Sequence, residues 1–332
     1  MHLRKIAVLA VALAALAAFT GCSNGNTKAE PSVADNEQSV TEDETETAEA
    51  SQPDTEAATE TPTEAPEPAD RIKVEYEIDS SKYDSVLTLW NDTDVKKQIV
   101  TYVAAVTDEN SEYFIPEEDR IVVTDIDGTM IGESGTKVNN DDMCLKSPQE
   151  ALEYVKSIQG DTFSERIGIT YGQMAYEPMK ELYAYLIDNG FQVYFVSGNC
   201  NSLTYALANN YFGADYAHSI GSNVELQIDE SHGYNVVPTG SYEGSWNEVK
   251  CYRIYNQIGK RPVMAFGNSD GDTQMLRWVA DNETYPSAVF MINHDDKERE
   301  VAYDTSSISK ICEKYEFTDV LMSENFKEVF GE

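Results

Sequence analysis

The chain has 332 residues, of which 25% are charged, and a formal net charge of −35 at pH 7. Its length allows one large domain or two small ones. Because nucleic-acid binding requires positive charge that displaces counterions, this acidic balance argues against nucleic acid as a partner.

The N-terminal residues have the pattern of an export signal. Arg4 and Lys5 precede the apolar run IAVLAVALAALAAF, which is shorter than the roughly 18 residues of a spanning helix. Small residues then lead to Cys22, as in a signal peptide cleaved just before that cysteine. The pattern resembles a bacterial lipoprotein signal. The resemblance implies a signal peptide at residues 1–21, a lipid on Cys22 and an exported protein anchored at the cell membrane. An uncleaved anchor and a plain signal peptide are the alternatives.

Residues 22–70 are predicted to be a disordered, acidic linker. Residues 23–70 contain 14 acidic residues against one lysine, Lys28, and almost no large apolar side chains. Such a segment cannot bury enough surface to offset its conformational entropy, and its like charges keep it extended. We expect a tether that holds the folded part away from the membrane.

From residue 71 to residue 332 the composition is that of a globular domain, in which amphipathic helices alternate with apolar strands. The segment SPQEALEYVKSIQG begins with Ser147, Pro148 and Glu150, a capping box with proline in the first turn, and predicts a helix that ends at Gly160. The predicted elements, in chain order, are a helix at 94–108, a strand within 120–129, helices at 147–160 and 177–190, a strand at 191–199, a helix at 202–211, a hairpin of 223–229 with 234–240, a helix at 249–259, a strand within 261–272, a helix through 275–279 and a strand within 287–296.

This alternation predicts an α/β fold with a Rossmann-like parallel sheet, because the central strands are apolar on both faces and need helices on each side. Ligands bind such sheets at the carboxyl ends of the strands. Each predicted strand ends in polar residues, with the sequences DIDGT, SGN, GNSDGD and NHDD. They point to one site. The insert at about 132–176 is modest in length, and we expect it to form a small, mainly helical cap.

The first strand ends in two carboxylates, Asp125 and Asp127, which alternation places on the same side of the chain. Two like charges this close need a cation between them or a shared proton. Mg²⁺ prefers oxygen ligands and commonly takes one or two carboxylates plus a phosphate. A carboxylate is ionised near neutral pH, so Asp125 is expected to attack phosphorus without an activating base. Asp127 is placed to protonate the leaving oxygen and later to deprotonate water.

These residues begin a series of four motifs. DIDGT resembles the first motif of the haloacid dehalogenase-like hydrolase superfamily, which implies Asp125 as nucleophile and Asp127 as acid and base. VSGN is similar to the second motif, with Ser197 bonding the phosphoryl oxygens. Lys250, at the start of a predicted helix, matches the third, and GNSDGD resembles the fourth. The order and spacing of all four agree. The wider resemblance, over roughly residues 75–330, is to a secreted, phosphoserine-phosphatase-like or acid-phosphatase-like subgroup.

The resemblance implies two sets of binding residues. Gly128 permits the sharp turn that exposes the two aspartates. The family often has Asp where this chain has Asn268, whose oxygen carries less charge, so metal affinity is expected to fall. The implied Mg²⁺ ligands are Asp125, Asp127, Asn268 and Asp272. The implied substrate-binding residues are Thr129, Ser197, Gly198 and Lys250.

Several residues keep two interpretations. Lys260 competes with Lys250 as the phosphate-binding cation. His294 and Asp295 either touch the substrate or form a structural pair, and the role of Asp270 is open. Tyr171 and Tyr176 are interpreted as packing residues. The pairing among Cys144, Cys200, Cys251 and Cys312 is also open, with free thiols as the alternative to disulfides.

The function that the sequence favours is Mg²⁺-dependent hydrolysis of a small phosphorylated metabolite through an aspartyl-phosphate. Asp127 argues against dehalogenation, because that reaction has no leaving alkoxide to protonate. Two alternatives stay open: a surface lipoprotein that binds phosphorylated ligands without turnover, and a phosphotransferase that uses an alcohol as acceptor.

Overall fold

The computed structural model describes residues 71–133, 138–231 and 233–331. The chain divides into two units, and all of the described residues belong to the second, Glu64–Glu332. The predicted signal peptide, Cys22 and the acidic linker therefore lie outside the described residues. Within those described ranges, no helix has the length and apolar character to cross a membrane.

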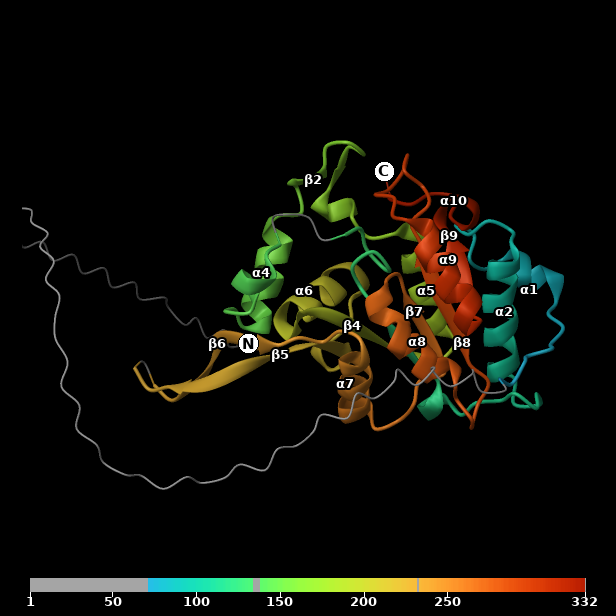
Figure 1. Ribbon diagram of the computed structural model, residues 1–332, viewed down its shortest axis with the longest axis horizontal. Coiled ribbons are helices and arrows are strands. Elements are labelled where there is room, and N and C mark those ends of the chain that lie inside the picture. Colours follow the sequence, from blue (N-terminus) through green and yellow to red (C-terminus); the bar gives the residue numbers. More distant parts are fainter. Residues whose placement is uncertain (1–70, 134–137, 232, 332) are drawn as a thin grey trace, which may run out of the picture. The chain divides into compact units, whose positions relative to one another are not determined.

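A seven-stranded sheet with the strand order β6-β5-β4-β1-β7-β8-β9 forms the centre of the unit (Figure 1). All neighbouring strands run parallel except β5 and β6, which are antiparallel. The predicted α/β fold with a mostly parallel sheet is confirmed. The strands are β1 (Ile121–Thr124), β4 (Gln192–Cys200), β5 (Ser219–Asp229), β6 (Asn235–Glu243), β7 (Met264–Gly267), β8 (Ala288–Asn293) and β9 (Thr318–Leu321).

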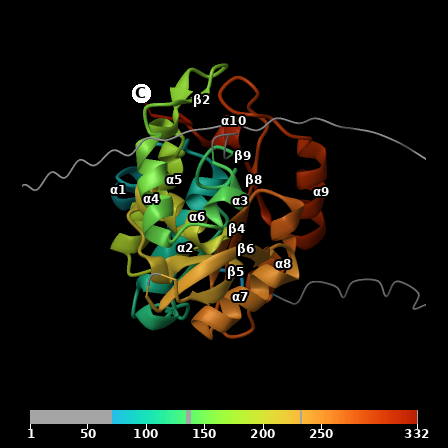
Figure 2. The same ribbon diagram turned by 90° about the vertical axis from the view of Figure 1, so that its left-hand side faces the viewer.

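Alternation along the central strands divides the core into two layers. Val122, Phe266 and Phe290 belong to the hydrophobic cluster that contains the apolar faces of α2, α5 and α6. Their neighbours, such as Val123 and Met291, belong to the cluster under α7, α8 and α9. Figure 2 shows the strands between these two helix layers. Because both faces are covered, every residue of β1, β7 and β8 is buried, as expected for parallel strands.

Most of the predicted helices begin and end within two residues of the predicted boundaries. The capping box of Ser147 and Glu150 is present, with Pro148 in the first turn, but this helix ends at Ser157 and not at Gly160. The α-helices are α1 (Ser80–Asp84), α2 (Asp94–Thr107), α3 (Asn140–Met143), α4 (Pro148–Ser157), α5 (Glu177–Asp188), α6 (Asn201–Phe212), α7 (Glu248–Ile258), α8 (Thr273–Ala280), α9 (Thr305–Tyr315) and α10 (Met322–Asn325). Short 3₁₀ turns are η1 (Glu117–Asp119), η2 (Tyr171–Gln173), η3 (Tyr216–His218) and η4 (Asp270–Asp272).

The insert between β1 and α5 holds α3, α4, η2 and a small antiparallel sheet of β2 (Thr162–Ser164) and β3 (Ile169–Thr170). The two helices make up most of its regular structure. The two-stranded sheet was not predicted, because segments this short carry no readable alternation.

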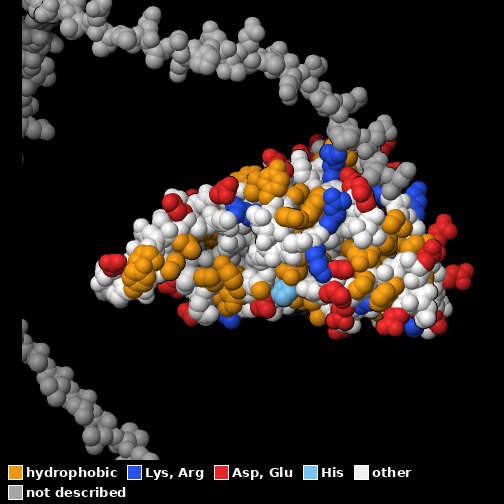
Figure 3. All heavy atoms as spheres, turned by 90° about the horizontal axis from the view of Figure 1, so that it is seen from below, with side chains coloured by type: hydrophobic (Ala, Val, Ile, Leu, Met, Phe, Trp, Pro, Cys, Tyr) orange, Lys and Arg blue, Asp and Glu red, His pale blue; other side chains and the backbone are white. Residues whose placement is uncertain are grey.

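The hairpin predicted around Gly233 is formed by β5 and β6. Its cross-strand pairs Leu226–Pro238 and Ile228–Val236 are apolar. Leu226, Ile228 and Val236 are nevertheless exposed. Figure 3 shows hydrophobic side chains on this hairpin, which extends away from the helix layers. The hairpin therefore presents an apolar face outside the core.

Trp90 joins three distant parts of the chain. It is fully buried, its Nε1 donates to the Pro178 carbonyl oxygen at 2.9 Å, and its ring meets that of Phe326 edge-on with centroids 5.0 Å apart. The segment before α2, the start of α5 and the C-terminal segment are thereby packed together.

We predict that Trp90→Ala lowers the free energy of unfolding by about 3–5 kcal/mol, because it leaves a large cavity. Trp90→Phe is expected to cost less, since it keeps a ring and loses the hydrogen bond to Pro178. Urea unfolding checks both, with Tyr234→Ala, a 78% exposed side chain, as the control that is expected to change little. A loss below about 1 kcal/mol for Trp90→Ala would contradict this packing role.

Candidate active site

The first motif follows β1 directly and remains tied to the sheet. The Asp125 amide donates to the Phe266 carbonyl oxygen at 3.0 Å, so the strand pairing with β7 continues to the carboxylate. Gly128 has a φ of 70°, and a Cβ at this position would collide with Asn268 Nδ2. Glycine therefore allows both the turn and the close approach of the fourth motif.

Lys250 connects the nucleophile candidate to the fourth motif. Its Nζ lies 2.5 Å from Asp125 Oδ1 and 2.6 Å from Asp272 Oδ1, and it also donates to the Val196 carbonyl oxygen at 3.2 Å. The three charged side chains are almost fully buried. One ammonium group thus contacts the residue after β1, the middle of β4 and η4, and it comes from the first turn of α7.

Burial and charge act in opposite directions on these groups. Burial raises the pKa of Asp125 to about 8, while the Lys250 ammonium opposes the rise. Burial lowers the pKa of Lys250, but the Asp125 and Asp272 carboxylates outweigh this effect and the net shift is upward. The sequence-based expectation that Asp125 is ionised near neutral pH was therefore incomplete, because it took the pKa of an exposed carboxyl group. Further positive charge beside Asp125 favours its ionised form.

Asp272 is held by hydrogen bonds on both oxygens. Its Oδ1 faces Lys250, while Oδ2 accepts from the amides of Asn268 and Ser269 at 3.1 Å each and from Ser269 Oγ at 3.0 Å. This arrangement fixes the loop after β7. Both oxygens of Asp272 already accept hydrogen bonds that position Lys250 and Asn268. This weakens the interpretation of Asp272 as a direct metal ligand.

The remaining oxygens form a set suited to a hard cation. Thr129 Oγ1 lies 3.3 Å from Asp125 Oδ2 and 3.2 Å from Asn268 Oδ1, so these two oxygens gather beside one hydroxyl. With Asp127 they supply only oxygen ligands, the kind that Mg²⁺ prefers. In the described part of the chain, no group of three His, Cys, Asp or Glu side chains is arranged to hold a metal ion.

These side chains line a pocket of about 300 Å³. Asp127 Oδ2 accepts a hydrogen bond from Asn199 Nδ2 at 2.7 Å, which orients this carboxylate within the pocket. The predicted residues Asp125, Asp127, Ser197, Gly198, Lys250 and Asn268 all line it, together with Glu133, Asn199, Ser245, Trp246, Ser269 and Gly271. Thr129 and Asp272 lie directly behind it through the contacts described above.

The three pocket residues that lie outside the four sequence motifs come from loops. Ser245 and Trp246 lie between β6 and α7, and Glu133 follows the first motif. Loop residues show no periodicity. Proximity of Ser245 and Trp246 to Lys250 in the sequence was the one available signal for them.

Other candidates lie outside the pocket. Lys260 pairs with Asp119 at 2.5 Å and not with Asp125. His294 is fully buried, with Nε2 at 2.6 Å from the Gly128 carbonyl oxygen and Nδ1 at 3.1 Å from that of Val301. It supports the DIDGT turn from behind.

Asp295 does not pair with His294; it accepts a hydrogen bond from the Ser323 amide at 2.9 Å. Asp270 is exposed. Tyr171 and Tyr176 are buried, in agreement with their interpretation as packing residues. The four cysteines Cys144, Cys200, Cys251 and Cys312 are free.

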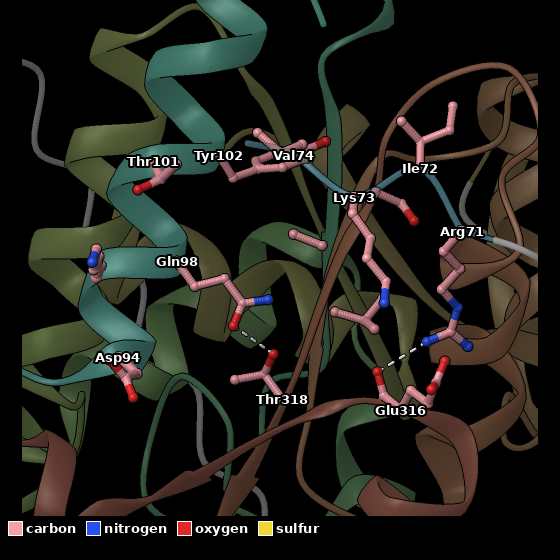
Figure 4. Close-up of a pocket in the computed structure, with 14 residues that line it drawn as sticks. Arg71, Ile72, Lys73, Val74, Asp94, Gln98, Thr101, Tyr102, Glu316 and Thr318 are labelled. Atoms are coloured by element: carbon pink, nitrogen blue, oxygen red, sulfur yellow. Dashed lines mark hydrogen bonds between the residues drawn. The ribbon is translucent and has the colours of Figure 1, made fainter. Parts of the chain in front are cut away.

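A larger cavity of about 520 Å³ lies beside the starts of β8 and β9 (Figure 4). Residues 71–74, α2 and the starts of β8 and β9 line it, and hydrogen bonds from Arg71 to the Glu316 carbonyl oxygen and from Thr318 to Gln98 cross its wall. It contains no pair of carboxylates held by a buried cation. The candidate chemistry therefore belongs to the smaller pocket.

No protein-family model matches the sequence, and no curated protein does. Several solved structures resemble the fold. A protein of unknown function from Anaerococcus prevotii has 13% sequence identity and a TM-score of 0.46, with 68% of this chain and 91% of that chain covered. A phosphoserine phosphohydrolase-like protein from Francisella tularensis has 14% identity and a TM-score of 0.32, with 58% and 99% covered. A substrate-bound phosphoserine phosphatase has 14% identity and a TM-score of 0.33, with 61% and 92% covered. Likenesses at this level carry no argument about the activity of this chain.

Glu300 is a buried carboxyl group that precedes Val301, whose carbonyl oxygen contacts His294 behind the DIDGT turn. It is 1% exposed, Oε1 accepts from the Val301 amide at 2.9 Å, and Oε2 has no hydrogen-bond partner among the described residues. Burial raises its pKa from 4.5 to about 7. The folded state therefore binds a proton more tightly than the unfolded state does.

We predict that this group makes stability fall as pH rises. The contribution of protonated Glu300 is present below pH 4.5 and is lost as pH passes about 7, a change of up to about 3 kcal/mol at 1.36 kcal/mol per pKa unit. Glu300→Gln cannot ionise at this position. Urea unfolding should therefore show that its free energy of unfolding falls less between pH 5 and pH 8 than that of the wild type. Glu298→Gln, at an exposed neighbouring position, is expected to keep the wild-type difference. An unchanged pH dependence in Glu300→Gln would refute the assignment.

Proposed function

We propose that this chain is a phosphatase of the haloacid dehalogenase-like type, which hydrolyses small phosphomonoesters through an aspartyl-phosphate on Asp125. One observation carries the proposal: Lys250 contacts Asp125 at 2.5 Å and Asp272 at 2.6 Å, at the wall of a pocket that Asp125, Lys250 and Asp127 line. A solvated turn needs no such arrangement. Buried charge is costly unless it is paired, and here the pairing places a carboxylate at the wall of a cavity.

The proposed reaction has two steps. Asp125 attacks the phosphorus atom, the bond between phosphorus and the ester oxygen breaks, and Asp127 gives its proton to the departing alkoxide. Asp127, now ionised, takes a proton from water, whose oxygen attacks the same phosphorus atom. This step releases inorganic phosphate and restores the Asp125 carboxylate.

Other pocket residues prepare the phosphoryl group for attack. Lys250 supplies positive charge next to the attacking carboxylate, and Ser197, which lines the pocket, would donate to a phosphoryl oxygen. Asn199 orients Asp127 through the 2.7 Å hydrogen bond. Precise orientation of these groups reduces the entropic part of the barrier.

Mg²⁺ belongs to the proposal because the donor set fits it. Asp125, Asp127 and Asn268 would hold the ion, and Thr129 is bonded to two of these ligands. When bound, the ion supplies positive charge opposite the oxygens of the transferring group.

A second candidate function is binding of phosphorylated ligands without turnover. Asn268 favours it, because an amide ligand contributes no negative charge to the metal site. Transfer of the phosphoryl group to an alcohol in place of water is a variant of the same chemistry, and analysis of products formed with added alcohols distinguishes it. Export and anchoring through a lipid on Cys22 complete the proposal and rest on the sequence pattern of residues 1–22.

We predict that the chain releases phosphate from a chromogenic phosphate ester with Mg²⁺ and loses this activity with a chelator. Asp125→Asn is expected to lower kcat on the order of 10³-fold or more, since the amide is not a nucleophile. Asp270→Asn serves as the matched control, because this carboxylate is exposed in η4, outside the pocket, and it should keep the wild-type rate. Ligand binding without turnover in the wild type would favour the second function, and full activity in Asp125→Asn would exclude Asp125 as the nucleophile.

A further inference from the structure

The loop between β6 and α7 forms one wall of the candidate active-site pocket. Ser245 and Trp246 both line this pocket. Ser245 is fully buried, whereas Trp246 is 48% exposed. The indole therefore borders the cavity on one side and solvent on the other, where the part of a substrate beyond its phosphate would lie.

Two glycines make room for the indole. A Cβ at position 244 would lie 2.5 Å from Trp246 Cη2, and a Cβ at 198 would lie 3.3 Å from Cε3. The six-membered ring thus rests against the backbone of Gly244 and of Gly198 in the second motif. A larger residue at position 244 would displace the ring without removing it.

The loop is tied to the motifs on both sides. The Ser245 amide donates to Ser222 Oγ at 2.9 Å, and Ser222 Oγ donates to the Gly198 carbonyl oxygen at 2.7 Å. On the other side, the Asn247 amide donates to the Gly271 carbonyl oxygen at 3.1 Å. The position of Trp246 is consequently fixed relative to the second and fourth motifs, which is the preorganisation that a binding wall needs.

The Ser245 hydroxyl is a buried polar group without a hydrogen-bond partner among the described residues. A buried hydroxyl without a partner is costly, and this one belongs to a residue of the pocket wall. Ser245 Oγ has almost no exposed surface in this structure. Rotation of the side chain toward the cavity would let an oxygen of a bound substrate satisfy it.

The charges of the pocket limit which charge the leaving group of a substrate can carry. Asp125, Asp127 and Glu133 line it, and the Lys250 ammonium is already shared by Asp125 and Asp272. A second anionic group on the substrate would approach these carboxylates at close range, which is unfavourable in a partly buried site. The wall therefore suits an uncharged leaving group.

We propose that Ser245 and Trp246 form the leaving-group subsite and that it selects phosphomonoesters of uncharged alcohols that carry a planar aromatic ring. The inference rests on the proposed function, because it places the phosphate of the substrate at Asp125. The ring stacks on the indole of Trp246, and Ser245 Oγ donates to an oxygen of the ester. Aromatic stacking of this kind has a preferred offset geometry that a puckered ring cannot match.

The test compares benzyl phosphate with cyclohexylmethyl phosphate, which have similar size and similar leaving alcohols but differ in planarity. We expect the wild type to have the higher kcat/KM for the benzyl ester. Trp246→Ala should reduce this preference about 10-fold, and Gly244→Ala, which keeps the indole but displaces it, should reduce it as well. Tyr234→Ala, an exposed aromatic side chain on the hairpin, is the control and should keep the wild-type ratio.

Two further measurements complete the test. 4-Carboxybenzyl phosphate should be a poorer substrate than benzyl phosphate by about 10-fold or more, because it brings a second anion. Ser245→Ala should lower kcat/KM for both uncharged esters by a similar factor, since its hydroxyl contacts the ester and not the ring. Thermal unfolding of each variant shows whether it is folded.

Benzylphosphonate, which is not hydrolysed, separates this inference from the proposed function. It should quench tryptophan fluorescence in the wild type and not in Trp246→Phe, which keeps Trp90 and Trp278. Quenching without hydrolysis of any ester would leave the subsite standing and overturn the proposed function. Hydrolysis of both esters with the same benzyl preference in the wild type and Trp246→Ala would overturn the subsite and leave the function standing. Neither quenching nor hydrolysis would overturn both.

Discussion

The Lys250 ammonium lies between the carboxylates of Asp125 and Asp272, at 2.5 and 2.6 Å, and the geometry of the candidate site depends on this contact. Removing one partner from a buried ion pair leaves an uncompensated charge and typically costs about 3–5 kcal/mol. The segments that follow β1 and β7, which carry the two aspartates, are therefore held together by charge as well as by the pairing of the strands. Burial also raises the pKa of Asp125. The same buried environment that fixes the carboxylate thus makes its reactivity sensitive to nearby positive charge.

The parallel sheet explains why residues far apart in the sequence reach this contact. β1, β4 and β7 lie side by side, so the segments that follow them leave the sheet at the same edge. Lys250 comes from the first turn of α7 and reaches the Val196 carbonyl oxygen in the middle of β4. Behind this edge, His294 approaches the carbonyl oxygen of Gly128, so the strand after the fourth motif supports the turn of the first. A continuous set of contacts from β4 to β8 holds the pocket.

Much of this arrangement could be predicted from the sequence. The apolar strands, the capping box at Ser147 and the four polar strand ends each have a local signal, and the rule for parallel sheets converts those signals into one site. The rest depends on tertiary contacts. Nothing local shows that Asp272 uses both oxygens to hold Lys250 and the Asn268 loop, or that Trp246 rests on two glycines. Strand β9 was missed because its four residues, TDVL, mix polar and apolar types without a readable period.

The central claim is that Asp125 becomes covalently phosphorylated. The most direct test is an acid quench of Asp127→Asn during its reaction with 4-nitrophenyl phosphate, followed by mass spectrometry of the peptide that contains residues 121–130. The 4-nitrophenolate leaves without the proton that this variant cannot supply. This variant lacks the group that activates water, so the account predicts that one phosphoryl group accumulates on Asp125. An enzyme that releases phosphate while this peptide is never modified, or that carries the phosphoryl group on another residue, would contradict the account.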